Sequence, residues 1–357
     1  MSDAKIFRVV DSGVLEGRLN IALGQAIVEA HHAGEAPDTL RFLRFPPTAL
    51  IGRHQALAEE VNLDYCRENG IGLARRITGG GAIFLDSGQL GWELALHRDT
   101  LAVGALADVA RELCEAVADG ISRLGVDARY RPRNDIEVDG RKISGTGGFF
   151  DGGTLFYQGT VLVDMDAQEM ASALRVPQAK LARRELDSAA RRVVTLRELL
   201  GERTPSLPAI QQSLLAALSE RLGFIMRPGE LSDAERLRAD EIFREEVGSD
   251  EFVAEIGVPP SARGDLRGSH SGPGGTITSY LRLEGPAQNR VRAALITGDF
   301  FITPPRVVYD LESRLRGVYL DDLASTVRAF FDDSPVEALS VRPEDFLASL
   351  ENAVHEP

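Results

Sequence analysis

The chain has 357 residues, of which 43% are hydrophobic and 26% charged, a composition typical of an ordinary soluble globular protein. Its formal net charge of −14 excludes a general nucleic-acid binder, and its two cysteines are too few for a disulfide framework or a zinc site. No apolar run approaches the ~20 residues of a membrane-spanning helix, and the N-terminus lacks a signal-peptide pattern. We therefore expect a cytoplasmic protein with one large domain and one smaller domain.

The first part of the chain predicts an amphipathic helix, two strands and a second helix. Residues 15–30 place apolar side chains at helical spacing, whereas 40–45 and 48–51 are short apolar runs separated by two prolines. We interpret His54, which follows the second run, as a surface histidine. Residues 62–69 are expected to form the next helix.

A glycine-rich stretch follows, in which residues 75–84 read Arg-Arg-Ile-Thr-Gly-Gly-Gly-Ala-Ile-Phe. Glycine within a strand often marks a place where a ligand or another backbone comes close. Three consecutive glycines expose backbone N–H groups, and Arg76 beside them can bind an anion in a bidentate manner. The stretch predicts a site for an anionic, phosphate-bearing ligand; the alternative is a flexible loop beside an unrelated pair of charges.

The next elements are a strand, a long helix and a hairpin. Residues 88–97 predict the strand, and 101–124 predict the helix, with Cys114 in its core-facing region. An Asp-Gly pair at 139–140 between two β-type runs is a strong hairpin signal. The turn places Lys142 on the second strand, next to the small residues 144–148. Lys142 is therefore a candidate functional residue, whereas most hairpin lysines are simply solvated charges.

The middle of the chain predicts a buried strand at 159–164 and a mostly helical, locally basic region at 167–201. Between Arg175 and Arg203 lie eight Arg or Lys residues and four Asp or Glu residues, a reversal of the overall charge balance. This segment is either a solvated helical face or a docking face for an acidic partner. Its most clustered basic residues are Lys180, Arg183 and Arg184.

Composition predicts the domain boundaries. Residues 1–257 form the large domain, which ends with a helix at 208–222 and an acidic amphipathic segment at 230–256. Residues 258–275 are rich in Gly, Ser and Pro and are expected to be a linker. Residues 276–357 form a small α+β unit, with a hairpin followed by three helices. Its elements are expected at 276–283, 290–297, 309–316, 320–332 and 343–354.

The sequence lacks the motifs of several common kinds of binding site. The chain has no Gly-x-x-x-x-Gly-Lys-Ser/Thr loop, no Gly-x-Gly-x-x-Gly opening a helix, and no cluster with metal-ligand spacing. Neither cysteine lies in a glycine-rich stretch, which argues against a cysteine nucleophile. A glycine-rich anion site, a lysine and hydroxyl groups remain, and these stabilise developing negative charge. They suit an adenylate-forming step, in which a carboxylate attacks the α-phosphate of ATP and pyrophosphate leaves.

The combined motifs resemble the lipoate–protein ligase family, over nearly the whole chain. The matching stretches are Gly-Arg-x-Gln at 52–55, Arg-Arg-x-Thr-Gly-Gly-Gly-Ala at 75–82, Asn-Asp at 134–135, Asp-Gly-Arg-Lys-Ile-Ser-Gly at 139–145, Gly-Thr-Val-Leu at 159–162, and the run 188–196. The C-terminal unit, with Gly-Asp-Phe-Phe at 298–301 and the run 311–319, is similar to the accessory domain of two-domain ligases. The resemblance implies an α+β fold: a mixed β-sheet catalytic domain of the biotin/lipoate ligase type, flanked by helices, plus a small α+β accessory domain.

The resemblance also implies an activity. Lipoate would be activated by ATP and Mg²⁺ to lipoyl-AMP, and the lipoyl group would then pass to a lysine of a lipoyl-domain acceptor protein. Such acceptors are the acyltransferase subunits of 2-oxo-acid dehydrogenases, the H protein of glycine cleavage, or a specialised lipoate-binding protein. Neither a nucleic acid nor a membrane is expected as a partner.

The resemblance implies a set of site residues. Lys142 would be catalytic, in contact with both the lipoate carboxylate and the α-phosphate, and Mg²⁺ would lie near Asp135. The residues expected to bind ATP or lipoyl-AMP are Arg76, Thr78, Gly79, Gly80, Gly81, Ala82, Ile83, Phe84, Asn134, Asp135, Lys142, Ser144, Gly145, Gln158, Gly159 and Thr160.

One departure and three rival functions accompany the resemblance. Gln158 stands where many ligases carry a histidine, which leaves the choice between lipoate and octanoate and the identity of the acceptor open. Octanoyl- and lipoyl-transferases share the fold but use a cysteine thioester, and no cysteine follows Cys114. A biotin ligase lacks support because its Gly-Arg-Gly-Arg-type loop is absent. A non-catalytic lipoate-binding protein is the third rival, and only an assay separates it.

Overall fold

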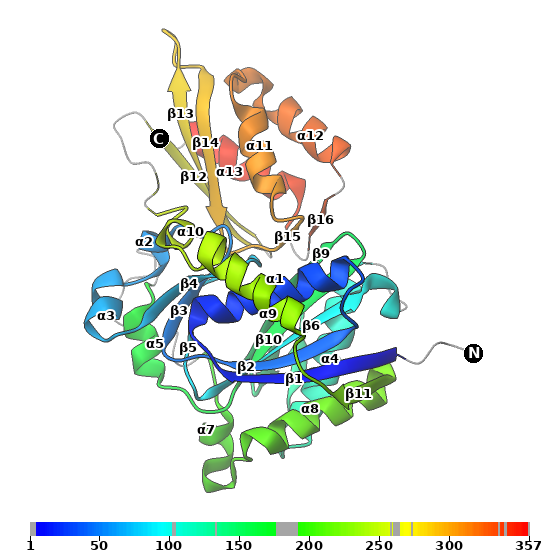
Figure 1. Ribbon diagram of the computed structural model, residues 1–357. Helices are drawn as coiled ribbons and strands as arrows, with labels where there is room; N and C mark the ends of the chain where they lie inside the picture. Colours follow the sequence, from blue (N-terminus) through cyan, green and yellow to red (C-terminus); the bar gives the residue numbers. More distant parts are fainter. Residues whose placement is uncertain are drawn as a thin grey trace.

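The computed structural model describes residues 5–101, 105–132, 134–175, 192–257, 259, 265–272, 274–334, 336–338 and 341–355. In the ribbon view the N-terminal two thirds of the chain surround one large sheet, and the C-terminal unit, coloured yellow to red, lies against one end of this body (Figure 1). None of the helices in the described ranges is long and apolar enough to cross a membrane.

The large sheet is mixed. Within the described residues its strand order is β11-β1-β2-β6-β10-β9-β8-β7. Strand β1 pairs in parallel with β11 and β2, whereas the remaining neighbours are antiparallel. The strands are β1 (Lys5–Val14), β2 (Thr39–Arg44), β6 (Gln89–His97), β7 (Arg129–Arg131), β8 (Asp135–Val138), β9 (Arg141–Asp151), β10 (Thr154–Leu162) and β11 (Phe224–Pro228).

Helices cover both faces of this sheet, so its central strand β6 is buried along nearly its whole length. Helices α4 (Leu106–Ser122) and α8 (Leu207–Leu222) pack on one face, where Leu90, Trp92 and Leu94 belong to the largest hydrophobic cluster. Helices α1 (Gly17–His32) and α9 (Asp233–Ile242) belong to the opposite face (Figure 1). The side chains of β6 that point toward α1 are therefore enclosed even when they are polar.

A three-stranded sheet, in the order β4-β3-β5, stands beside the large one. Its strands are β3 (Thr48–Ile51), β4 (Gly72–Arg75) and β5 (Ile83–Leu85), and short helices lie around it. The short helices of the N-terminal part are α2 (Leu57–Glu60), α3 (Leu63–Glu68), α5 (Ala167–Ala173), α7 (Leu196–Leu200) and α10 (Asp250–Val253), with single turns at Arg98–Thr100, Gly201–Arg203 and Phe243–Val247.

The C-terminal unit has its own sheet and its own hydrophobic cluster, which includes Phe300, Leu311 and Phe346. The unit contains β12 (Leu266–Gly272), β13 (Gly275–Glu284), β14 (Arg290–Gly298), β15 (Ile302–Thr303), β16 (Glu337–Ala338), α11 (Val307–Leu315), a turn at Leu320–Asp322, α12 (Leu323–Asp333) and α13 (Pro343–His355). The predicted hairpin and three helices are confirmed. The exact division into domains at 257 and 276 stays a prediction.

The prediction of a linker over 258–275 was wrong for its second half, because β12 lies there and pairs with β13 through seven residue pairs. The strand has no apolar alternation, so its sequence gives no strand signal. Its backbone packs directly on α13: a Cβ added to Gly268 would lie 2.0 Å from the amide nitrogen of Ala353. A glycine that suggested a flexible linker instead permits a close approach between a strand and a helix.

Candidate functional site

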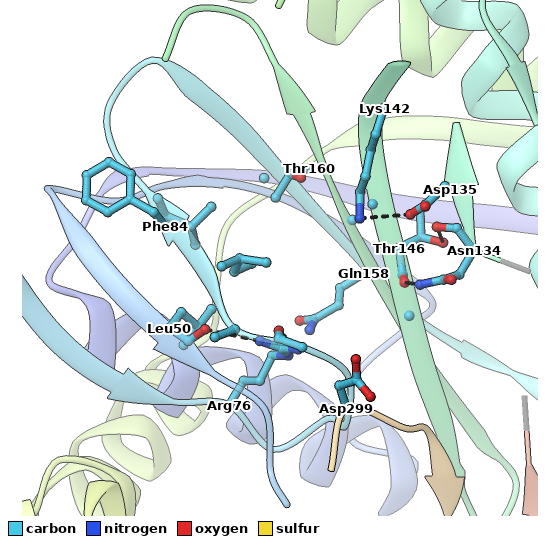
Figure 2. A pocket seen from close by; sticks show the side chains of 18 of the residues that line it. Leu50, Arg76, Phe84, Asn134, Asp135, Lys142, Thr146, Gln158, Thr160 and Asp299 are labelled. Atoms are coloured by element: carbon cyan, nitrogen blue, oxygen red, sulfur yellow. Dashed lines mark hydrogen bonds and ion pairs between the residues drawn. The ribbon is translucent and has the colours of Figure 1, made fainter. Parts of the chain in front are cut away.

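A cavity of about 830 Å³ opens between the large sheet, the small sheet and the C-terminal unit (Figure 2). Of the residues predicted from sequence, its lining includes Arg76, Gly81, Ala82, Ile83, Phe84, Asn134, Asp135, Lys142, Gly145, Gln158, Gly159 and Thr160. The predicted residues Thr78, Gly79, Gly80 and Ser144 are not part of the lining. The sequence motifs thus converge on one cavity, although four of the nominated residues stand behind its wall.

Lys142 lies at the cavity because the hairpin forms as predicted. The turn residues Asp139 and Gly140 both have positive φ, and β8 and β9 pair on either side of them. The ammonium of Lys142 lies 2.8 Å from a carboxylate oxygen of Asp135 (Figure 2). A Cβ at Gly145 would lie 2.5 Å from the Lys142 nitrogen, so this glycine makes room for the side chain. The cation is held at the cavity wall in a set orientation.

Residues 192–194 of the basic segment hold the backbone of Lys142 through hydrogen bonds. Its amide donates to the carbonyl of Arg192 over 2.8 Å, and its own carbonyl accepts from the amide of Val194 over 2.9 Å. Val193 lines the cavity. The conspicuous run at 188–196 therefore ends beside the candidate catalytic lysine. Residues 176–191, and with them Lys180, Arg183 and Arg184, lie outside the described residues.

A hydrogen-bonded network supports the Asn134–Asp135 corner from behind. The Asn134 carbonyl accepts from both the amide (2.8 Å) and the hydroxyl (2.9 Å) of Thr146, and the Asn134 side chain donates to the Thr146 carbonyl over 2.7 Å. The Thr146 hydroxyl also lies 2.7 Å from the hydroxyl of Tyr157 and 3.2 Å from the sulfur of Cys114. The corner that carries Asp135 is thus fixed to the core.

The structure gives Arg76 a different task from the predicted one. Its guanidinium donates to the backbone carbonyls of Leu50, Gly79 and Gly81, with distances between 2.7 and 3.3 Å. These bonds use four of its five N–H groups. Burial lowers the pKa of Arg76 to about 10. Arg76 therefore holds the glycine loop in shape, and little of its donor capacity remains for a bidentate anion.

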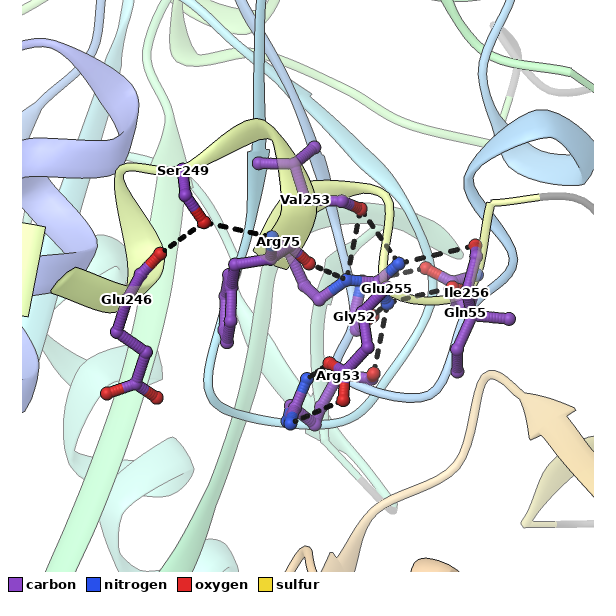
Figure 3. A network of polar contacts seen from close by, with 10 residues as sticks. Gly52, Arg53, Gln55, Arg75, Glu246, Ser249, Val253, Glu255 and Ile256 are labelled. Atoms are coloured by element: carbon purple, nitrogen blue, oxygen red, sulfur yellow. Dashed lines mark hydrogen bonds and ion pairs between the residues drawn. The ribbon is translucent and has the colours of Figure 1, made fainter.

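Its neighbour Arg75 organises the loop at 52–55, a role that sequence analysis did not assign to it (Figure 3). Its buried side chain donates to the carbonyls of Gly52, Arg53 and Gln55 and to that of Val253. Burial lowers the pKa of Arg75 to about 10. One arginine thus ties the loop after β3 to the end of α10, and both adjacent arginines have backbone carbonyls as partners.

Two of the three consecutive glycines contact the C-terminal unit. A Cβ at Gly79 would lie 2.0 Å from the Phe300 carbonyl oxygen, and the Gly80 amide donates to that oxygen over 2.9 Å. The ring of Phe301 lies 2.4 Å from where a Cβ of Gly80 would be and 2.2 Å from where one of Gly147 would be. Both glycine-rich stretches therefore admit Phe301, and only Gly81 of the triplet lines the cavity.

The prediction of a surface position for His54 was wrong. The side chain is buried, and its ring stacks on Phe300 at a centroid distance of 5.2 Å. Neither ring nitrogen has a hydrogen-bond partner among the described residues. Burial, together with the charges of Arg53 and Arg75, lowers the pKa of His54 to about 3. The histidine is part of the contact between the two units, which a sequence pattern does not reveal.

Neither cysteine reaches the cavity. Cys66 and Cys114 are free thiols with exposures of 1% and 0%. Burial raises the pKa of the Cys66 thiol and raises that of Cys114 to about 11. Both residues therefore remain protonated at neutral pH and enclosed by side chains.

The geometry does not fit the predicted Mg²⁺ position near Asp135. One oxygen of this carboxylate faces the ammonium of Lys142, and the other lies 2.6 Å from the guanidinium of Arg131. Among the described residues no group of three or more His, Cys, Asp or Glu side chains could hold a metal ion. A carboxylate already bracketed by two cations is a poor metal ligand.

Sequence analysis did not nominate six charged or aromatic lining residues. They are Phe45 just after β2, Trp92 and Glu93 on β6, Arg131 on β7, and Asp299 and Phe301 of the C-terminal unit. Glu93 offered a usable signal, because a carboxylate within an apolar strand needs a partner or a purpose. The two residues of the C-terminal unit are more than 150 residues from Lys142 in the chain, and only the fold brings them to the cavity.

The comparisons with known proteins agree with this geometry. Residues 16–219 match the family model described as the lipoyl protein ligase A/B catalytic domain. An octanoyltransferase LipM from Symbiobacterium thermophilum is 30% identical over 269 residues, which cover 69% of this chain and 97% of the relative. The lipoate-protein ligase A subunit 1 of Thermoplasma acidophilum is 29% identical over 245 residues, covering 66% and 91%.

Solved structures are similar in the same way. A bi-partite lipoate protein ligase from Thermoplasma acidophilum, studied with its E2 lipoyl domain, gives a TM-score of 0.65 at 28% identity over 71% of this chain and 98% of that chain. Plasmodium falciparum LipL1 gives a TM-score of 0.71 over 93% of this chain and 95% of its own, at 16% identity, which is a likeness in fold. The family model covers more than half of the sequence, and the chain belongs to the lipoyl protein ligase A/B catalytic domain family.

Proposed function

We propose that this protein is an ATP-dependent lipoate–protein ligase. It would convert lipoate to lipoyl-AMP and then transfer the lipoyl group to a lysine of a lipoyl-domain acceptor protein. The observation that carries the proposal is the composition of the cavity wall: a lysine held by Asp135 is present, and both thiols of the chain are buried elsewhere.

The relatives include both ligases and octanoyltransferases, and the positions of the cysteines support the ligase for this protein. Acyl transfer through a thioester needs a thiolate that the acyl donor can reach. Cys114 comes within 3.2 Å of the Thr146 hydroxyl, yet it is fully buried and its pKa is raised to about 11. Cys66 lies in the cluster around the small sheet. These positions favour a mechanism without a thiol.

The cavity suits an acyl-adenylate in size and character. Its volume is within the range of roughly 300–1,000 Å³ usual for small-molecule sites. One part of the wall carries Lys142, Asn134 and the backbone of Gly81, and another part is apolar, with Ile21, Leu43 and Leu50. Two similar solved structures support a site for both substrates, because one is of a lipoate-protein ligase A bound with ATP and the other has bound lipoic acid.

The proposed chemistry has two steps. A lipoate carboxylate oxygen attacks the α-phosphorus of ATP, the bond to the bridging oxygen breaks, and pyrophosphate leaves with the electron pair. The amine of the acceptor lysine then attacks the acyl carbon, AMP departs and the amine loses a proton. The Lys142 ammonium would lie between the two anions of the first step, where it would offset their repulsion and stabilise charge gathering on phosphorus. Mg²⁺ would arrive with the phosphates, since the described side chains offer no preformed metal site.

The acceptor is proposed to be a lipoyl domain that docks near the basic segment 175–203. Residues 192–194 of this segment pair with Lys142, so a partner bound there would present its lysine close to the cavity. The studied Thermoplasma acidophilum ligase was paired with an E2 lipoyl domain. A local excess of positive charge would offset long-range repulsion between two acidic proteins.

The test offers the purified protein lipoate, octanoate or biotin, each with ATP, Mg²⁺ and a lipoyl domain, and weighs the acceptor by mass spectrometry. We expect ATP-dependent addition of a lipoyl or octanoyl group and release of pyrophosphate. A parallel reaction supplies an octanoyl-carrier protein without ATP. Modification in that reaction alone would establish the transferase, and no modification in either reaction would favour a binding protein.

A further inference from the structure

The apolar part of the cavity ends at a row of polar side chains. Arg41 on β2, Glu93 on β6 and Gln158 on β10 are directly opposite one another across three neighbouring strands. Residues paired in this way project from the same face of a sheet. Glu93 and Gln158 line the cavity, together with Ile21, Leu43 and Leu50.

The carboxyl group of Glu93 is held in place from two sides. The Arg41 guanidinium donates to one of its oxygens over 2.6 Å, and Arg41 itself is fully buried. From the other side α1 approaches at a glycine: a Cβ at Gly24 would lie 3.2 and 3.3 Å from the two carboxylate oxygens. Glu93 is 5% exposed, so its desolvation is already complete before a ligand binds.

Both lining groups present acceptors. Burial raises the pKa of Glu93, and the ion pair with Arg41 opposes this shift; in that ion pair the carboxylate offers acceptors only. The amide nitrogen of Gln158 donates one of its two N–H groups to the hydroxyl of Thr78 over 2.8 Å, which fixes the amide and leaves its carbonyl oxygen as an acceptor. An alkyl tail placed against these groups would exclude water and supply no donor, and buried acceptors without donors are costly.

The spacing matches the length of a medium-chain acid. The Lys142 nitrogen lies beside Gly145 of β9. Two residues further along β9 is Gly147, which pairs with Gln158 of β10, and Gln158 in turn pairs with Glu93 of β6. Standard strand geometry makes the separation between Gly145 and Glu93 roughly 12 Å. An extended octanoyl chain whose carboxylate contacts Lys142 would bring its far end to Glu93.

We propose that Glu93 and Gln158, at the end of the apolar part of the cavity, select carboxylic acids whose far end carries hydrogen-bond donors. Of the two redox forms of lipoate, the reduced dithiol is therefore preferred. The proposal rests on the proposed function, because it assumes that the cavity holds an acyl chain with its carboxylate at Lys142. If this part of the cavity were wholly apolar, it would instead prefer an acid with a saturated alkyl chain.

The test measures binding of a length-matched series by calorimetry, without ATP and without turnover. Nonanoate, ω-hydroxyoctanoate and ω-methoxyheptanoate differ in whether the tail is apolar, a donor, or an acceptor alone. We expect the hydroxy acid to bind on the order of 10-fold or more tighter than the other two, as for a hydrogen bond to a charged group. Dihydrolipoate should likewise bind more tightly than lipoate under anaerobic conditions.

Variants separate this proposal from the proposed function. Arg41→Met with Glu93→Leu removes the buried pair together and should reverse the order, so that nonanoate binds best. Glu235→Gln is the matched control, because Glu235 is another buried carboxylate paired with an arginine, Arg8, and lies outside the cavity lining. If the wild-type protein binds all three acids and binds nonanoate most tightly, the proposed selectivity is wrong, whereas the proposed function stands. Failure of every acid to bind would overturn the proposed function as well.

Discussion

The ammonium of Lys142 and the carboxylate of Asp135 lie 2.8 Å apart at the wall of the cavity, and Arg131 neutralises the same carboxylate from its other oxygen. Asp135 therefore keeps one cationic partner when Lys142 turns toward a substrate. That movement would leave no buried unpaired charge, because Lys142 is partly exposed. The hairpin would keep its shape, because residues 192–194 hold the backbone of Lys142 independently of its side chain. The arrangement suits a lysine that exchanges a protein anion for a ligand anion.

Lys142→Ala should lower the rate of acyl-adenylate formation by about 10²–10³-fold, the scale of one preorganised charge stabiliser. The melting temperature should hardly change, since a partly exposed lysine contributes little to the core. Pyrophosphate release with lipoate and ATP measures the rate. Arg141→Ala is the control: this neighbour pairs with Glu198 and does not line the cavity, and its removal should leave the rate within about twofold. A Lys142→Ala protein with more than half of the wild-type rate would refute the assignment.

Catalysis should not need a thiol. The double variant Cys66→Ser, Cys114→Ser is expected to form lipoyl-AMP and modify the acceptor at near wild-type rates, at a modest cost in stability. At Cys114 the serine hydroxyl can still bond to Thr146 and Tyr157, which preserves the network behind the Asn134–Asp135 corner. Circular dichroism confirms folding, and mass spectrometry of the acceptor reports activity. A folded variant that makes no product would point to a thioester mechanism.

Gly147→Ala should destabilise the protein through a clash with Phe301, whose ring lies 2.2 Å from where the new methyl group would stand. Overpacking of this kind costs roughly 1–3 kcal/mol. Adding Phe301→Ala should recover part of the loss, so the double-mutant cycle should show a clear coupling energy in urea unfolding.

Gly159→Ala provides the control for this cycle. Its methyl group would meet Trp92 at 2.5 Å, on the opposite side of the sheet from Phe301. Phe301→Ala should not rescue it. Equal rescue of both glycine variants, or of neither, would show that the ring of Phe301 does not occupy the space left by Gly147.

The sequence predicted features that depend on neighbouring residues. The hairpin around Asp139 and Gly140 is confirmed, because both turn residues adopt the positive φ that this dipeptide favours. The position of Lys142 follows from that turn and from the alternation of a strand. The family resemblance added the order of the motifs, and residues from most of them line one cavity.

Features that depend on contacts between residues far apart in the chain could not be predicted from the sequence. The glycines at 79 and 80 were assigned to a phosphate, whereas their close contacts are with Phe300 and Phe301, about 220 residues further along the chain. Arg76 looked free to bind an anion until the fold placed three carbonyl groups around it. Glu93 stands in an apolar strand, and its meaning appears only when the register places Arg41 and Gln158 on either side.

His54 should make the protein sensitive to acid. Its pKa is about 3 in the folded state against 6.5 for an unperturbed histidine, so the unfolded chain binds more protons between these values. The stabilising effect of keeping His54 neutral is fully present above pH 6.5 and is lost as the pH falls. Each pH unit costs about 1.4 kcal/mol, or about 2 kcal/mol between pH 6.5 and about pH 5.

His54→Phe should remove this component while keeping the stack on Phe300. The difference in unfolding free energy between the variant and the wild type should therefore grow by about 2 kcal/mol in favour of the variant when the pH falls from about 7 to about 5. Comparing the two proteins is essential, because Glu60 and Glu312, whose pKa values burial raises to about 7, act in the opposite direction. The same substitution at the exposed His355 should produce no such difference. A constant offset between His54→Phe and the wild type across this range would mean that His54 is able to take up a proton in the folded protein.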